Sequence, residues 1–354
     1  MKRLHALKYL NVLLLPILGY ISFTNTGWLT FTPVIESFVV IPLLELFFKP
    51  DQSNLSEAEE AIRAKDRIYD WQLYLMVPVQ YILLFVFLTN ISDPSLTTID
   101  LIGRISGMGM LCGVIGINVA HELGHRSTWH EQLMAKMLLL TSLYMHFFIE
   151  HNKGHHRNVS TKEDPSSARY GEALYFFWVR SVVFAYLSAW KIENERLKKL
   201  GKSFFSIQNE MIRFQLIQIG LTVGIGFAFG WIVMGYFILA AVMGFLLLET
   251  VNYIEHYGLQ RQKKGDAYER VMPHHSWNSD HIVGRIVLFE LSRHSDHHFI
   301  ASRKYQILRH MDHGAQMPTG YPGMMILATI PPLWFFVMNP RIKEIRSQML
   351  QQAA

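Results

Sequence analysis

Long apolar blocks dominate this sequence and constrain what the chain can fold into. Half of the 354 residues are apolar and 17% are charged, against about 25% charged in an ordinary soluble domain. About 20 helical residues cross the hydrocarbon core of a bilayer, so the blocks predict an integral membrane protein with six transmembrane helices. We expect these spans at about 8–24, 28–48, 71–91, 99–119, 212–232 and 235–254.

Basic residues in the loops predict the orientation of the spans. Three Lys or Arg residues stand in the first eight positions and four more lie within 49–67, whereas the loops 24–27 and 92–98 contain none. The positive-inside tendency therefore puts the N-terminus in the cytoplasm. Four crossings then return the chain to the cytoplasmic side near residue 120.

The remaining sequence is expected to complete one all-α domain, 1–354. Two further apolar segments, 133–149 and 175–190, are too short to cross twice, so we expect them to pack against the bundle or to lie at the interface. The sequence thus predicts six transmembrane helices with a cytoplasmic, histidine-rich catalytic cap. The cap is expected to comprise 120–211 and 255–340.

The motif HELGH at 121–125 fits the H-E-x-x-H pattern of zinc metalloproteases. Three more histidine groups follow it: EHNKGHH, NYIEHYG and RHSDHH. On a helix, residues three or four apart share a face, so each longer group is expected to aim two imidazoles at one point and the adjacent histidine at another. The nine candidate metal ligands are His121, His125, His151, His155, His156, His256, His294, His297 and His298.

Nine histidines are more than one ion needs, so two metal ions are predicted. Nitrogen-rich sites suit zinc, copper, iron or nickel. A site beside a hydrocarbon phase favours iron and oxygen activation, because zinc has no accessible redox change. A membrane zinc protease remains an alternative, although most of the histidines would then be idle. A histidine-rich metal transporter is a further alternative, but its histidines would be expected within the spans.

At these residues the sequence resembles the membrane-bound non-haem diiron alkane 1-monooxygenases, also called alkane omega-hydroxylases. HELGHRS is similar to the first histidine box of that family, EHNKGHHRNVSTKEDPSSAR to the second, NYIEHYGLQR to its HYG box and LSRHSDHHFIASRKYQ to the third. The resemblance covers about 115–340. Fatty-acyl desaturases and hydroxylases share the three-box pattern, but NYIEHYGL with H-x-x-x-H-H is typical of the alkane and xylene group.

The resemblance implies hydroxylation of the terminal methyl of linear alkanes to 1-alkanols, with O₂ as co-substrate and two irons held by the nine histidines. It implies electrons from a rubredoxin, which an NAD(P)H-dependent reductase recharges, and a bacterial inner membrane as the location. Since Cys112 is the single cysteine, we expect rubredoxin to be a separate protein. A hydroxylase of methyl-arenes, like xylene monooxygenase, and a fatty-acyl hydroxylase or desaturase stay open as alternatives. The sequence contains no basic run interleaved with aromatic residues, so no nucleic acid partner is expected.

Charged residues around the boxes give further candidates. A metal-bound imidazole usually donates its second N–H to a carboxylate or carbonyl, and the carboxylates within or beside the boxes are Glu122, Glu150, Asp164, Glu255 and Asp296. By electrostatic steering, an acidic rubredoxin would dock on basic residues, for which the candidates are Arg157, Lys162, Arg261, Lys263, Lys264, Arg303 and Lys304. Some Met and aromatic residues of the spans could line a substrate tunnel, although packing or contact with lipid is their commoner role. They are Trp28, Met76, Phe85, Met108 and Met110.

Overall fold

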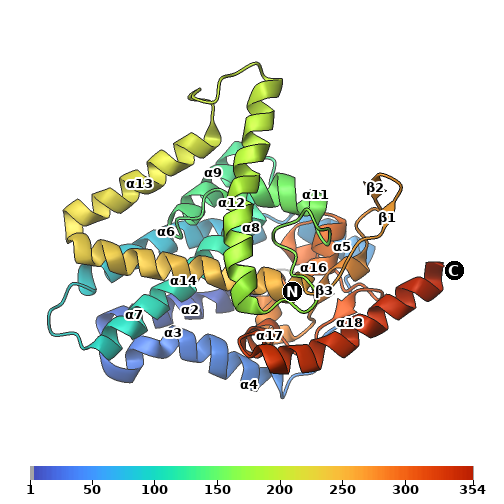
Figure 1. Cartoon of the computed structure of the whole chain (residues 1–354). Coiled ribbons are helices and arrows are strands. Elements are labelled where there is room, and N and C mark those ends of the chain that lie inside the picture. The colour runs from blue at the N-terminus through green and yellow to red at the C-terminus, as the bar shows by residue number, and fades with distance from the viewer. Residues whose placement is uncertain (1–3, 354) are drawn as a thin grey trace.

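The computed structural model describes residues 4–353, and almost all of its regular structure is helical (Figure 1). Six helical stretches in this part are long and apolar enough to cross a bilayer, which confirms the predicted number. They are His5–Thr24, Gly27–Glu45, Ile68–Asn90, Thr98–Gly124, Glu210–Phe229 and Trp231–His256. Neither 133–149 nor 175–190 is among them.

Several spans are built from more than one kind of helical turn. The first comprises α1 (Leu4–Leu7), η1 (Lys8–Leu13) and α2 (Leu14–Thr24), and the second η2 (Gly27–Phe31), α3 (Thr32–Ile35), η3 (Glu36–Val40) and α4 (Ile41–Glu45). The third is α6 (Ile68–Asn90), and the fourth joins α7 (Thr98–Leu111), η4 (Cys112–Ile117) and α8 (Asn118–Gly124). The fifth and sixth are α13 (Glu210–Phe229) and α14 (Trp231–His256).

The remaining elements form the cap and the connection between the second and third spans. The helices are α5 (Glu57–Lys65), α9 (Trp129–Leu140), α10 (Phe147–Glu150), η5 (His151–His155), α11 (His156–Asn158), α12 (Leu174–Lys199), η6 (Pro273–His275), α15 (Ile282–Val287), α16 (His294–Phe299), η7 (Tyr305–Ile307), α17 (Tyr321–Ala328) and α18 (Pro331–Ala353). Strands β1 (Lys263–Lys264) and β2 (Ala267–Tyr268) pair antiparallel, and β3 (Trp277–Asn278) and β4 (Ala315–Gln316) pair parallel.

Local sequence signals explain where the spans start and turn. Thr97 caps the fourth span: its hydroxyl accepts from the backbone N–H of Asp100, and the Asp100 carboxylate accepts from the N–H of Thr97. This reciprocal pair satisfies two donors that a helix start leaves free. Between α13 and α14 the chain reverses at Gly230, whose φ of 102° favours glycine. The last two spans therefore form a helical hairpin.

Three π-helical segments interrupt the regular α-helical repeat. They are η3 in the second span, η4 in the fourth span and η5 in the second histidine group. Such segments insert an extra residue into a turn and occur frequently at functional sites. Of these segments, η3 and η4 line the apolar cavity described below, and η5 contains His151 and His155.

The cap gathers at one end of the span bundle. In Figure 1 the span helices α2, α7, α13 and α14 lie toward the left, whereas α11, α16 and the strands lie toward the right. The fourth and sixth spans end there, at Gly124 and His256. One hydrophobic core fills the bundle, and a second one beneath the cap surrounds Tyr253, Trp277 and Trp334. The cytoplasmic orientation of this end stays a prediction.

Close packing of the fourth span against the sixth depends on glycine. A Cβ at Gly244 would lie 2.5 Å from Cβ of Cys112 and 3.3 Å from the backbone nitrogen of Gly113. Small residues let membrane helices approach closely in this way. We expect Gly244→Ala to reduce stability by about 1–3 kcal/mol through overpacking, measured as a lower thermal unfolding midpoint. Gly235→Ala on the same helix is the control, because its Cβ would meet nothing within 4 Å; equal loss in both variants would contradict the prediction.

Candidate metal centre

Four segments bring the nine predicted ligands together. His121 lies on α8 with His125 directly after it, and His256 is the last residue of α14. The second histidine group occupies η5 and α11, and the third occupies α16. Within the described residues the nine side chains form two groups with converging ring nitrogens. Their role as metal ligands stays a prediction.

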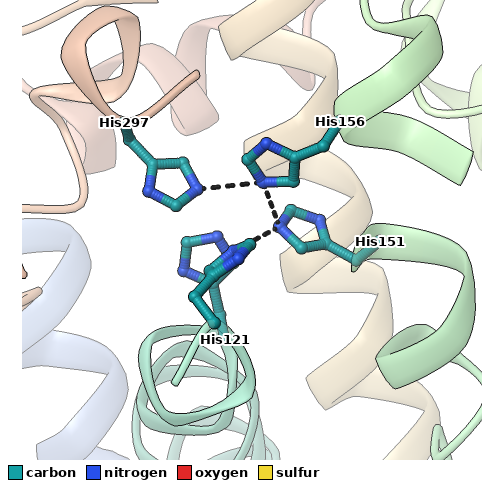
Figure 2. A group of neighbouring side chains, drawn as sticks. His121, His151, His156 and His297 are labelled. Carbon is teal, nitrogen blue, oxygen red and sulfur yellow. Dashed lines mark hydrogen bonds between the residues drawn. The ribbon is translucent and has the colours of Figure 1, made fainter. Parts of the chain in front are cut away.

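The first group contains five histidines. Nε2 of His151 lies 3.1 Å from Nε2 of His125 and 3.0 Å from that of His156, which lies 3.1 Å from Nε2 of His297. His121 completes the group, and the five nitrogens all lie within 4.8 Å of one another. Figure 2 shows the rings of His121, His151, His156 and His297 turned toward a common centre. We call these residues the five-histidine group.

The second group contains four buried histidines. Nε2 of His155 lies 3.2 Å from Nε2 of His298, and Nε2 of His294 lies 3.2 Å from that of His256. These four nitrogens also lie within 4.8 Å of one another. We call these residues the four-histidine group. Two separate sets of donors fit two metal ions better than one.

Helical spacing correctly predicts which histidines share a group in the first and third histidine boxes, and it fails in the second box. His121 and His125 share a group, as do His294 and His298, each pair four residues apart. In the second box His151 instead joins His156, five residues away, and His155 turns to the other group. The cause is η5, because a π-helix places residues five apart on one face.

Burial favours the neutral form of several of these histidines, in which one ring nitrogen carries no proton. Burial, and then the neighbouring imidazoles, hold the pKa values of His151, His156 and His297 well below the usual range. The pKa of His298 is lowered in the same way, by burial and then by His294. A metal binds only the deprotonated ring nitrogen. The donor set therefore fits transition metals that accept imidazole, among them iron.

Asp164 lies behind a ring of the four-histidine group, in the position that a supporting carboxylate would occupy. Its Oδ2 lies 2.9 Å from Nδ1 of His155 and accepts from the Ser167 hydroxyl at 2.6 Å. Burial raises the pKa of Asp164, but the charge and hydrogen bond of His155 and the Ser167 bond outweigh burial and lower it. An Nδ1–H donated to Asp164 leaves Nε2 of His155 free for a metal.

This contact leads to a prediction for metal retention. We expect Asp164→Ala to weaken metal binding by about 10- to 100-fold, the usual cost of losing a partner of a ligating histidine. Competition with a graded series of chelators measures the change. Glu163→Gln is the control, since its side chain is exposed and contacts none of the nine histidines. Unchanged retention in Asp164→Ala would show that the carboxylate does not support the ligand.

Glu255 lies on the ligand side of a ring and not behind it. Its Oε2 is 3.2 Å from Nε2 of His294, the nitrogen that faces His256, and its Oε1 accepts from the Tyr321 hydroxyl at 2.7 Å. The predicted role as support from behind therefore does not match its position. Glu255 therefore places a carboxylate oxygen, a candidate metal ligand, at the edge of the four-histidine group.

The other three carboxylates bind elsewhere. Glu122 accepts from Arg126 at 2.5 Å and from the backbone N–H of Tyr305 at 3.2 Å. Asp296 accepts from the backbone and the guanidinium of Arg309, at 3.0 and 3.1 Å. Glu150 accepts a long bond of 3.4 Å from Ser188. Among the described residues these three make no hydrogen bond to a histidine of either group. Their partners lie on the same or neighbouring segments.

Several predicted docking residues are occupied within the protein. Arg303 pairs with Glu60 and Asp296, and Lys304 pairs with Asp70. The guanidinium of Arg261 donates to the backbone carbonyls of Glu269 and Arg157. The side chain of Lys264 lies outside the described part of the structure. The exposed candidates that remain are Arg157, Lys162 and Lys263.

An apolar cavity connects the spans with both histidine groups. It measures about 80 Å³ and is walled by Phe38 of the second span, Val114 of the fourth and Leu247 of α14. Its inner end reaches His121 and His151 of the five-histidine group and His294 of the four-histidine group. A cavity with such a largely apolar lining suits an apolar chain better than a polar ligand.

Of the five residues proposed from the sequence to line a substrate tunnel, one lies at this cavity. Met110 lines it, whereas Met76 and Met108 are buried in the core, and Trp28 and Phe85 are exposed on the outside of the bundle. Apolar residues that face a cavity and those that face lipid have the same composition, so only the packing of the spans separates them.

Comparison with known proteins supports the resemblance of the boxes. The fatty acid desaturase family matches residues 101–328. An alkane 1-monooxygenase of Pseudomonas aeruginosa is 43% identical over 88% of this chain and 83% of its own length. One of Pseudomonas putida is 38% identical over 92% and 82%, respectively. The chain belongs to the alkane 1-monooxygenase family.

Within the wider group, the relation to arene-oxidising enzymes is more distant. The hydroxylase component of xylene/toluene monooxygenase from Pseudomonas putida is 28% identical over 77% of the chain and 73% of its own length. The match to the fatty acid desaturase family includes all four histidine segments, from His121 to His298.

Proposed function

We propose that this chain is an alkane 1-monooxygenase that hydroxylates the terminal methyl of linear alkanes. One C–H bond of the methyl and one oxygen atom of O₂ give the 1-alkanol, and the other oxygen atom leaves as water after two electrons and two protons are taken up. The observation that carries the proposal is the apolar cavity that ends at both histidine groups. The alkane 1-monooxygenases of the two Pseudomonas species support it.

The proposed cofactor is a pair of irons, held by the five-histidine group and the four-histidine group. When bound, two irons supply the redox chemistry that an unactivated C–H bond requires, which zinc lacks. The protein would orient both the ligand and the substrate. Asp164 orients His155, and the apolar wall with Phe38 and Val114 would hold the end of the alkane and exclude water.

We also propose the surroundings in which this reaction runs. One catalytic domain, 1–354, lies in a bacterial inner membrane with its cap, 120–211 and 255–340, in the cytoplasm. Alkanes then enter from the bilayer, while a separate rubredoxin and its NAD(P)H-dependent reductase deliver electrons from the water side. Arg157, Lys162 and Lys263, which remain exposed, would attract an acidic rubredoxin.

A reconstituted assay tests the activity. Iron-loaded protein in bilayer nanodiscs, supplied with rubredoxin, reductase, NADH and octane, is expected to form 1-octanol and to contain two irons per chain. Oxygen use without oxidation of any alkane, but with oxidation of m-xylene, would favour the arene-hydroxylase alternative. One zinc per chain and no need for iron would overturn the proposal and favour a protease.

Docking has its own test. Replacing Arg157, Lys162 and Lys263 by glutamate is expected to raise the rubredoxin concentration needed for half-maximal rate and to weaken its dependence on salt, since both follow from attraction between opposite charges. Lys343→Glu on α18 is the control, outside the docking candidates. An unchanged salt dependence in the triple variant would place the docking surface elsewhere.

A further inference from the structure

A second cavity lies between the second histidine group, the loop that follows it and α12. Its volume is about 700 Å³, and its lining contains six basic and three acidic residues together with three large apolar residues of α12, Phe184, Leu187 and Ile192. We call it the basic groove. It is distinct from the apolar cavity, because the two share no lining residue.

Most of the positive charge in the basic groove has no partner inside the protein. Arg180 is paired with Glu172 and donates to the carbonyls of Pro165 and Ser167. The other five basic side chains make no ion pair or hydrogen bond with the described residues. These five are Lys153, Arg157, Lys162, Arg169 and Lys191.

The acidic residues of the groove do not balance this charge. The carboxylate of Asp164 contacts His155 and Ser167, and that of Glu163 is hydrogen-bonded to Tyr268. Glu195 is the remaining carboxylate among the lining residues. Five free cations beside one free carboxylate make a site for an anion.

The position of α12 indicates which anion. The helix has an exposed apolar face, with Phe176 and Val179 77% and 68% exposed and Val183, Phe184 and Leu187 following at helical spacing. It packs on α14 and runs steeply across it in Figure 1. A helix that crosses the direction of the spans and exposes an apolar face is suited to lie in the plane of the membrane interface.

We propose that the basic groove binds an anionic phospholipid. The headgroup phosphate lies among Lys153, Arg169 and Lys191, and an acyl chain follows the apolar wall formed by Phe184 and Leu187 toward the bilayer. Charge alone would suit an acidic protein equally well. The apolar wall favours a lipid, because it continues into the exposed face of α12.

Such a lipid would brace the second histidine segment. Gly154 and Asp164 line the basic groove, and Asp164 holds His155 of the four-histidine group. A bound headgroup fixes the position of α12 relative to this segment without contacting the histidines themselves.

Lipid retention provides the test. Delipidated protein in dodecyl maltoside is titrated with dioleoyl phosphatidylglycerol or dioleoyl phosphatidylcholine, and bound lipid is counted by native mass spectrometry. Wild type is expected to retain one phosphatidylglycerol in preference to phosphatidylcholine. Removing two charges in Arg169→Gln/Lys191→Gln should lower this retention about 30-fold, or about 2 kcal/mol.

Matched variants separate the groove from general charge and from misfolding. Lys198→Gln/Lys199→Gln removes the same charge from the same helix outside the groove and should leave retention unchanged. Leu187→Gln changes the apolar wall without changing the charge and should also lower retention. The thermal unfolding midpoint of each lipid-free variant shows whether it is folded.

Three outcomes would overturn the proposal. The first is equal retention of both lipids by wild type, or no loss in the two groove variants. The second is full displacement of the lipid by millimolar inorganic phosphate, which would make the groove a site for free anions. The third is a raised requirement for rubredoxin in Arg169→Gln/Lys191→Gln with unchanged lipid retention, which would make the groove a protein-docking surface. The first two results are read from lipid retention alone and do not depend on alkane hydroxylation.

Discussion

Replacing His294 by alanine is expected to abolish alkane hydroxylation and to lower the iron content from two ions per chain to one. His294 is one of only four nitrogen donors in its group, and its Nε2 faces both His256 and Glu255. Loss of a direct ligand should exceed the loss of about 10- to 100-fold that follows removal of a ligand's supporting partner. Iron analysis of the purified variant and its rate with octane measure the two effects.

His130→Ala is the matched control for this experiment. His130 is exposed at the start of α9 and belongs to neither histidine group. It should keep both irons and the wild-type rate. If His294→Ala also kept both irons and its rate, the four-histidine group would not be a metal site.

Val114→Phe is expected to shorten the apolar cavity and so to change which alkanes are oxidised. Val114 lines the cavity two helical turns before His121, a distance of about 10 Å along the span. An added ring there should cost long substrates about 1–3 kcal/mol by overpacking, or about 5- to 160-fold in kcat/KM. Decane should therefore lose far more activity than pentane, while iron content stays unchanged.

Ile102→Phe on the same span is the control for added bulk. Ile102 is exposed and lies outside the cavity, so its substitution should leave the preference for chain length as it is. Equal loss for pentane and decane in Val114→Phe would show that the alkane does not extend past Val114.

The number of spans and the set of candidate ligands could be predicted from the sequence because each depends on local pattern. Apolar blocks of membrane length are visible without a structure, and they gave six spans in agreement with the helices. The nine histidines stand out by spacing. Helical spacing predicted their division in the first and third boxes but not in the second, because nothing in HNKGHH indicates that η5 is π-helical.

The carboxylates show where sequence proximity misleads. Asp164 contacts His155 from nine positions away, whereas Glu122, next to His121, turns to Arg126. A residue adjacent to a ligand on a helix points in a different direction from it. Which carboxylate supports a histidine therefore depends on how loops such as the one at 159–169 fold back, and that is decided by tertiary packing.

Two pairs of adjacent histidines have a geometric consequence for the centre. His155 and His156 belong to different groups, and so do His297 and His298. Consecutive Cα atoms are about 3.8 Å apart across a trans peptide, so two peptide bonds link the five-histidine group directly to the four-histidine group. The backbone thus limits how far the two groups can separate, because a shift of either segment moves one histidine of each group together.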